Sequence, residues 1–91
     1  MRYNRWVRKG AKRDIERICT NHPEMAVLIR PLADWMIAQL AENPKERGEL
    51  LNSQNVTIQF RRWTVGPLTV IFRMMPDEDQ TVIIVGFVPG L

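Results

Sequence analysis

The chain has 91 residues, 45% of them hydrophobic and 25% charged, which suits one soluble globular domain and is too short for two. Its single cysteine, Cys19, excludes an intramolecular disulfide and suits a reducing compartment. No apolar run approaches the roughly 18 residues of a membrane span, and no apolar signal core follows the basic start. We therefore expect a cytoplasmic protein that has no membrane partner.

Positive charge is concentrated at the start of the chain. Residues 1–17 contain seven basic and two acidic residues, a net charge of +5, whereas the whole chain has a net charge of +3. Ten of the thirteen basic residues are arginines, which suit bidentate contacts with phosphate or carboxylate groups. A nucleic-acid backbone or an acidic protein segment would fit such a surface. A solvated face without a partner is the remaining alternative.

A short strand and a helix are predicted first. Residues 3–7 favour an extended segment that Gly10 ends, with Trp6 in the core. Apolar residues then recur at the spacing of one helical stripe, which ends at residues 20–23. The stripe consists of Ala11, Ile15, Ile18 and Cys19.

A second, longer helix is predicted next, with Pro23 in its first turn. Asn21 and Glu24 have the spacing of a capping box, and Asn43 ends the helix. Pro31 lies inside the helix and should kink or split it. The predicted buried stripe is Leu28, Leu32, Trp35, Met36 and Leu40. A polar connection over residues 45–54 should then bend at Gly48 and return Leu50 and Leu51 to the core.

Three antiparallel strands are predicted in the last third of the chain. Val56, Ile58 and Phe60 alternate with polar residues, as in a half-buried strand. Turns are predicted at residues 66–67 and 76–79, with largely apolar strands over residues 68–75 and 81–88. The order predicts one α+β domain over residues 1–91, with two N-terminal helices packed on one face of a small antiparallel sheet of about four strands.

Arginines are the candidate site residues. Arg61 and Arg73 are predicted to lie side by side on the face of the sheet that the helices leave open. Two guanidinium groups there would bind a phosphate or stabilise the charge of a phosphoryl-transfer transition state, unless they pair with cross-strand carboxylates. Arg62 and Trp63 complete this candidate nucleic-acid surface, and Trp63 would either stack an unpaired base or pack in the core or rim.

The other reactive side chains predict no cofactor and no metal. His22 is the only histidine and is expected to belong to a capping region. One histidine and one cysteine cannot assemble a zinc site, and no Ser-His or Cys-His pair is recognisable. The acidic run at residues 77–79 is expected to be a solvated turn rather than a Mg²⁺ site.

Residues 57–88, TIQFRRWTVGPLTVIFRMMPDEDQTVIIVGFV, resemble the RelE/ParE superfamily of bacterial toxins, in a divergent branch often described as plasmid-stabilisation-like. Two N-terminal helices with a basic start extend the resemblance over most of the chain. The resemblance implies the toxin component of a type II toxin–antitoxin system, with a cognate antitoxin protein as partner. RelE-type members cleave mRNA on the ribosome without a metal, using basic residues of the concave sheet face. ParE-type members inhibit DNA gyrase.

The family's catalytic pattern matches in part. Its basic positions on the second strand correspond to Gln59 and Arg61, whereas the arginine after the turn corresponds to the apolar Leu68. The basic and aromatic residues expected after the last strand fall on residues 87–89, and the chain ends at Leu91 without the family's C-terminal tail. Arg61 and Arg73 are then the catalytic candidates, but no side chain is found for the general acid.

Four functions remain open from this pattern. The first is a metal-independent mRNA endoribonuclease, and the second is a gyrase-directed inhibitor. The third is a non-catalytic module of the same fold that pairs with an antitoxin-like partner, and the fourth is a plain nucleic-acid binder whose affinity falls steeply with salt.

Overall fold

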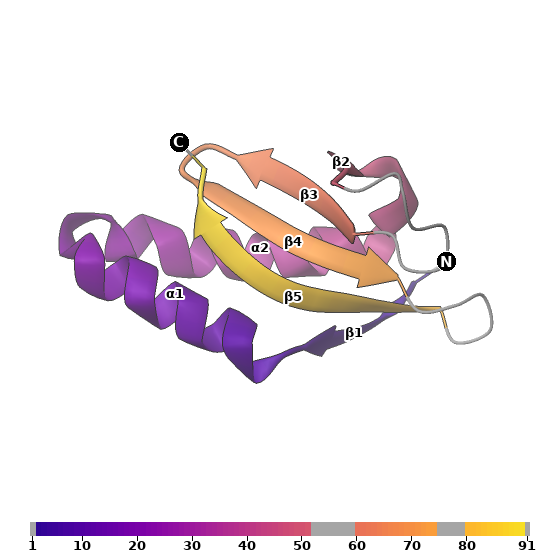
Figure 1. Ribbon diagram of the computed structural model, residues 1–91, viewed down its shortest axis with the longest axis horizontal. Helices are drawn as coiled ribbons and strands as arrows, with labels where there is room; N and C mark the ends of the chain where they lie inside the picture. Colours follow the sequence, from indigo (N-terminus) through magenta and orange to yellow (C-terminus); the bar gives the residue numbers. More distant parts are fainter. Residues whose placement is uncertain (1, 52–59, 75–79, 91) are drawn as a thin grey trace.

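The computed structural model describes residues 2–51, 60–74 and 80–90 (Figure 1). Along the chain the elements are β1 (Asn4–Val7), α1 (Lys9–Asn21), the 3-10 helix η1 (Pro23–Met25), α2 (Ala26–Glu42), the 3-10 helix η2 (Pro44–Glu46), β2 (Glu49–Leu50), β3 (Phe60–Val65), β4 (Leu68–Met74) and β5 (Thr81–Pro89). None of the described helices has the length and apolar character needed to cross a bilayer.

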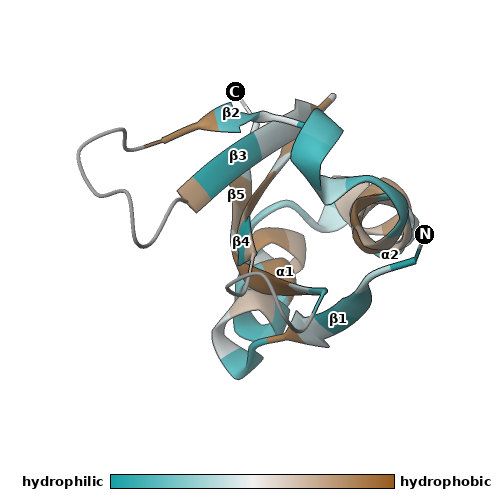
Figure 2. Ribbon diagram, turned by 90° about the vertical axis from the view of Figure 1, so that its right-hand side faces the viewer, coloured by the Kyte–Doolittle hydropathy of each residue, from teal (hydrophilic) through white to brown (hydrophobic). Residues whose placement is uncertain are grey.

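The five strands form one sheet in the order β1-β5-β4-β3-β2. β1 runs parallel to β5, and the other neighbours are antiparallel. Figure 2 shows both long helices on the same side of this sheet. The predicted α+β fold is therefore confirmed, although the sheet is mixed and larger than the expected four strands. The added strand is the two-residue β2, which is too short to produce a periodic sequence pattern.

The core lies between the helices and β4 and β5. Leu68, Val70 and Phe72 of β4 are fully buried on the face that the helices cover. Three residues of the predicted α1 stripe are buried against this face, namely Ala11, Ile18 and Cys19. Removal of these apolar side chains from water is the main force that fixes the helices on the sheet.

The buried stripe of α2 matches the predicted one only in part. Its buried residues are Ile29, Ala33, Met36, Leu40 and Ala41. The predicted burial of Met36 and Leu40 is therefore confirmed, and Leu32 is partly buried against the core. Leu28 and Trp35 are 53% and 47% exposed, so their predicted burial is wrong. The first half of α2 carries apolar residues on most of its sides, and a helix of this kind does not reveal from its periodicity which side faces the sheet.

The predicted end signals of the helices hold only in part. α2 continues through Pro31 and is not split. Pro31 leaves the carbonyl of Val27 without its usual helical donor, and Val27 is 87% exposed, so water can reach this turn. The capping box is wrong, because α1 continues through Asn21 and His22 occupies the cap position of η1 without a side-chain cap hydrogen bond.

Both edge strands carry apolar side chains that were expected in the core. Trp6 of β1 is 59% exposed, and Leu50 and Leu51 at β2 are 46% and 42% exposed. Val7 pairs with the buried Ile84, and successive strand residues point to opposite faces, so Trp6 must point away from the helices. An edge strand has a neighbour on one side only, which leaves such side chains partly open to solvent.

The hairpin between β3 and β4 has the predicted two-residue turn. Val65 pairs with Leu68, and Gly66 adopts a φ of +56°. This left-handed conformation favours glycine, because it has no Cβ to clash. The predicted strand residues Val56 and Ile58, and the predicted turn at residues 76–79, lie outside the described residues.

Candidate nucleic-acid interface

The register between β3 and β4 decides where the four predicted site residues lie. Arg61 pairs with Phe72 and Trp63 with Val70, so both share the helix-covered face with buried core residues. Arg73 pairs with Phe60 on the opposite face, which we call the open face. The predicted side-by-side pair of Arg61 and Arg73 is therefore wrong. The prediction had placed the side of β3 that carries Arg61 on the open face, whereas the observed pairing turns this side towards the helices. Side chains alternate along a strand, so a difference of one residue in the pairing register moves every side chain to the other face.

Arg61 and Trp63 belong to a cluster at the rim of the helix-covered face. The Arg61 Nε donates to the carbonyl oxygen of Arg47 at 3.3 Å, and its Nη2 donates to that of Gly48 at 3.4 Å. The guanidinium of Arg47 lies 4.9 Å from the centre of the Trp63 ring. The rings of Trp35 and Trp63 are tilted against each other with centroids 5.8 Å apart. We call this set the Trp–Arg cluster.

The contacts of the Trp–Arg cluster favour packing as the role of Trp63, one of the two roles that the sequence allowed. One cation and one aromatic ring already contact the indole, and such contacts stabilise a partly buried aromatic side chain. Base stacking by Trp63 stays a prediction. Arg61 in turn connects β3 to the backbone that leads into β2.

Arg62 and Arg73 occupy the open face. Arg62 lies opposite Ile71, two residues before Arg73 on the same strand, so the two arginines are diagonal neighbours across β3 and β4. The Arg62 Nε and Nη2 both contact the Glu49 carboxylate at 2.7 Å. The cross-strand carboxylate pair that the sequence allowed for the sheet arginines is thus formed by Arg62. No carboxylate among the described residues forms an ion pair with Arg73.

A groove of about 430 Å³ crosses the open face. Arg62 and Glu49 line it together with Thr64, Thr69 and Ile71, and the end of β5 closes it. The two threonine hydroxyls are 2.7 Å apart and hydrogen-bonded to each other. We call this the open-face groove. It places a guanidinium, a carboxylate and two hydroxyl groups next to one another, which is a set able to bind a phosphate and to exchange a proton.

Glu49 is the residue of this groove that the sequence analysis missed. It belongs to a strand of two residues, so no alternation marks it as part of the sheet. Only its pairing with Arg62 brings it to the open face. An acidic residue directly after a glycine, Gly48, was the one local signal, and it is common in ordinary loops.

The described part of the chain contains no group of three or more His, Cys, Asp or Glu side chains that could hold a metal ion. Cys19 is buried in the core, and His22 is exposed between α1 and η1. Neither residue lines the open-face groove.

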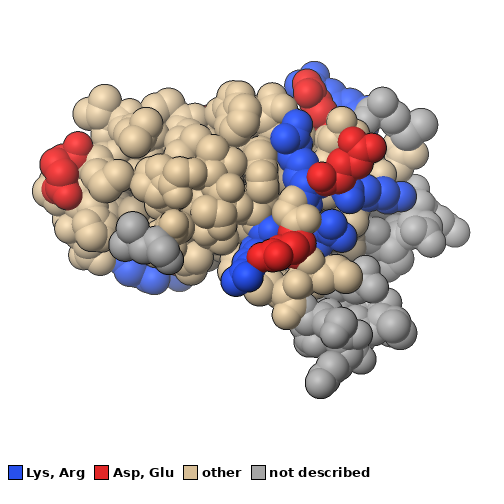
Figure 3. Space-filling model, turned by 90° about the horizontal axis from the view of Figure 1, so that it is seen from above, with Lys and Arg blue, Asp and Glu red and all other residues tan. Residues whose placement is uncertain are grey.

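The charged groups are unevenly spread on the side of the molecule that carries β2 and β3. Figure 3 shows basic and acidic side chains interleaved towards one end and a broad surface without charges between them and the charged groups at the opposite end. The exposed apolar residues of α2, including Val27, Leu28 and Trp35, contribute apolar area to the molecular surface.

No protein-family model and no curated protein sequence matches the chain. Among solved structures, the chain is similar to one from the crystal structure of the toxin–antitoxin complex RelBE2 from Mycobacterium tuberculosis, with a TM-score of 0.70. The sequences are 18% identical, and the match covers 98% of this chain and 92% of that chain. An agreement of this extent at low identity concerns the course of the backbone rather than the site residues. The chain therefore has a RelE-like fold.

Proposed function

We propose that this protein is the toxin of a toxin–antitoxin pair, that it acts on mRNA at the ribosome through the open-face groove, and that an antitoxin protein restrains it. The observation that carries this proposal is the similarity over 98% of the chain to a chain from a toxin–antitoxin complex. The guanidinium groups of the open face support RNA as the target, because arginine binds phosphate with good geometry. Action on the ribosome implies a cytoplasmic location.

Metal-independent RNA cleavage needs a base, stabilisation of charge on the phosphate, and a proton for the leaving group. The ribose 2′-OH attacks the adjacent phosphorus while the base removes its proton, the phosphate gains charge, and the bond from phosphorus to the 5′-oxygen breaks. The leaving 5′-oxygen takes its proton from water, because no side chain is assigned as the general acid. Arg62 and Arg73 are the proposed groups for the phosphate, replacing the expected pair of Arg61 and Arg73. Glu49 is the titratable group within 2.7 Å of Arg62, and we assign it the removal of the 2′-OH proton.

Arg61 has a positioning role in this proposal. Its guanidinium holds the carbonyls of Arg47 and Gly48 on the helix-covered side of the sheet. Glu49 is the next residue along the chain, so the contacts of Arg61 help to place this carboxylate opposite Arg62. Replacement of Arg61 should therefore weaken the function through Glu49 rather than through loss of a contact with RNA.

Induced expression in a bacterium tests the proposal. We expect the wild-type chain to arrest growth and to generate new mRNA ends, and co-expression of the neighbouring open reading frame to restore growth. The Arg62→Ala/Arg73→Ala variant should relieve the arrest, because the guanidinium of the groove and that of its diagonal neighbour on the open face are lost. The Arg13→Ala/Arg17→Ala variant removes the same charge from exposed positions of α1 and should remain toxic.

The same experiment separates the alternatives. Growth that is unaffected by the wild-type chain would contradict a toxin. Arrest without new mRNA ends would instead indicate a gyrase-directed inhibitor or a non-catalytic binding module. Equal relief by both double variants would show that overall charge, rather than the groove, determines the effect.

A further inference from the structure

We propose that the junction of β1 and α1 is a second nucleic-acid site, which binds single-stranded RNA through its phosphates and one stacked base. This inference rests on the proposed function only in naming RNA as the ligand. It concerns residues that contribute nothing to the open-face groove, and its test measures binding rather than growth.

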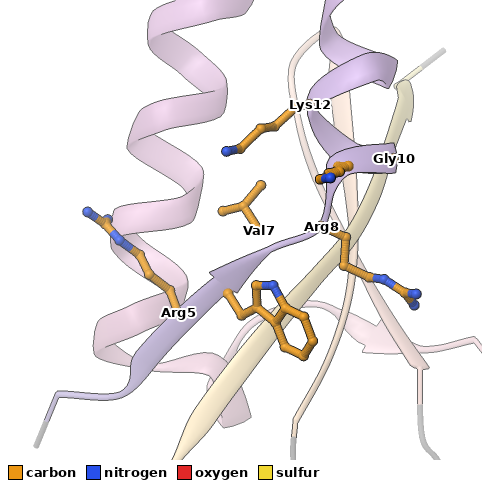
Figure 4. A pocket seen from close by; sticks show the side chains of 7 residues that line it. Arg5, Val7, Arg8, Gly10 and Lys12 are labelled. Carbon is orange, nitrogen blue, oxygen red and sulfur yellow. The ribbon is translucent and has the colours of Figure 1, made fainter.

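The site is a concavity of about 750 Å³ with a basic lining. Its lining includes Arg5, Arg8, Lys9 and Lys12, together with Trp6, and all five residues are exposed. We call it the basic pocket. Figure 4 shows that Arg5 and Lys12 lie on one side of the junction and Arg8 on the other. The positive charges thus surround the junction, and a phosphate backbone crossing it would meet cations on both sides.

The cations of the basic pocket have no acidic partners in the described structure. The ion pairs among the described residues involve Arg17, Arg30 and Arg62, and none involves a residue of the basic pocket. No acidic side chain lines the pocket. Asp34 lines adjoining hollows together with Arg5 and with Lys12, and Glu16 lines one of them, but neither carboxylate forms an ion pair with these cations. Four like charges without an ion-paired partner repel one another, and an anionic ligand relieves that repulsion while it releases its own counter-ions.

Trp6 connects the basic pocket to the open face. It pairs with Ile83 of β5, and Ile83 pairs with Arg73 of β4. Residues directly opposite one another share a face, so Trp6, Ile83 and Arg73 form a row across three strands. The indole is 59% exposed, which leaves area for stacking an unpaired base. A single strand bound in the pocket can therefore continue towards Arg73.

The lining favours RNA over an acidic protein segment. A protein partner is usually anchored by apolar side chains in a desolvated centre. Here the apolar lining is limited to Trp6 and the half-buried Val7. One exposed aromatic ring among four cations is instead the combination that binds single strands without sequence preference.

Binding of fluorescein-labelled oligouridylate RNA to the purified full chain tests the site. If four phosphates are neutralised, the logarithm of the binding constant should fall with the logarithm of the salt concentration with a slope of roughly −2.8. The Arg8→Gln/Lys12→Gln variant should reduce this slope by about 1.4 and weaken binding roughly 25-fold at 0.1 M salt. The Trp6→Ala variant should weaken binding by roughly fivefold or more through lost stacking.

The matched control is Arg13→Gln/Arg17→Gln, which removes two charges from α1 outside the pocket. It should bind within about twofold of the wild type, because nonspecific charge loss has little effect on a localised site. Equal weakening by both double variants, or no binding by the wild type, would overturn the proposal. Binding of polyglutamate with equal or higher affinity than RNA would assign the pocket to an acidic protein segment instead. Thermal melting shows whether each variant is folded. If Trp6→Ala does not fold, the comparison of Arg8→Gln/Lys12→Gln with Arg13→Gln/Arg17→Gln still tests the site.

This test is independent of the proposed function. RNA binding that depends on Arg8 and Lys12 would stand even if induced expression left growth unchanged. A toxic chain with an intact groove but no binding at the basic pocket would refute the second site alone.

Discussion

At the residue scale, two glycines share a left-handed backbone conformation but differ in how closely other atoms approach them. Gly48 and Gly66 have φ values of +74° and +56°, a region in which a side chain is strained. A Cβ added to Gly48 would meet the main-chain carbonyl of Arg62, whereas one added to Gly66 would have nothing within 4 Å. Gly48 therefore allows the close approach of β2 to β3 that brings Glu49 to Arg62.

We predict that Gly48→Ala destabilises the protein far more than Gly66→Ala. Both alanines accept the left-handed conformation at about 1–2 kcal/mol. Only Gly48→Ala also forces two backbone segments apart, which adds about 1–3 kcal/mol. The free energy of unfolding from urea denaturation measures both variants. Similar values for the two would mean that β2 does not lie close to β3.

At the element scale, one side chain connects α1 to β5. The Phe87 N–H donates to the Asp14 carboxylate at 3.0 Å. The contact follows a β-bulge in β5, where Ile71 pairs with Gly86 while Phe72 pairs with Ile84, so that Val85 is left over. A bulge disrupts the regular ladder locally, and the carboxylate from α1 accepts a donor next to it. The buried Phe87 is thereby held in the core.

Asp14→Ala should destabilise the protein by about 1–3 kcal/mol, because it leaves the partly buried Phe87 N–H without an acceptor. Asp14→Asn is the matched control, since its amide oxygen can accept the same hydrogen bond, and it should cost less. Urea denaturation of both variants checks this. A loss in Asp14→Asn as large as that in Asp14→Ala would mean that the carboxylate charge, rather than the hydrogen bond, is what matters.

At the scale of the whole molecule, four basic side chains gather at the junction of β1 and α1, and other charged side chains form exposed ion pairs elsewhere. Arg30 on α2 donates hydrogen bonds from both terminal nitrogens to the Glu16 carboxylate on α1. These hydrogen bonds, together with the charge of Arg30, lower the pKa of Glu16 below its ordinary value of 4.5. Both side chains are largely exposed, so the pair makes a small, salt-sensitive contribution to stability.

The pair predicts a pH dependence of global stability. A carboxyl group whose pKa is lower in the folded state stabilises the fold above its unfolded pKa, and this contribution is lost as the pH falls through the folded pKa. Glu16→Gln should therefore melt at a lower temperature than the wild type at pH 7. The difference should disappear as the pH is lowered from about 4.5.

The control for this prediction is Glu24→Gln, which changes an exposed glutamate with no ion pair among the described residues. Its melting temperature relative to the wild type should show a smaller change over the same pH range. A Glu16→Gln difference that persists unchanged at pH 3 would show that the carboxylate charge is not its cause, and no difference at pH 7 would show that the ion pair does not stabilise the fold.

The sequence alone was sufficient for the order of the long helices and strands, for the buried stripe of α1 and for the two sets of residues that share a face of β4. Ala11, Ile18 and Cys19 recur at helical spacing, and Leu68, Val70 and Phe72 alternate along a strand. Both patterns are local, and each reports which residues share a face. The turn at residues 66–67 is likewise a local signal. The resemblance of residues 57–88 to the RelE/ParE toxins rested on the same local order and agrees with the fold.

The tertiary structure decided which face of each strand is covered. The register of β3 against β4 sends Arg61 to the helix side and Arg73 to the open side, and the pairing of β2 with β3 brings Glu49 to Arg62. The parallel pairing of β1 with β5 directs Trp6 away from the core. Such pairings join residues far apart in the chain, and their energy comes from burial and hydrogen bonding in the assembled sheet. A periodic pattern within one strand does not show which other strand it pairs with or in which register. The proposed site residues could therefore be selected only from the paired strands.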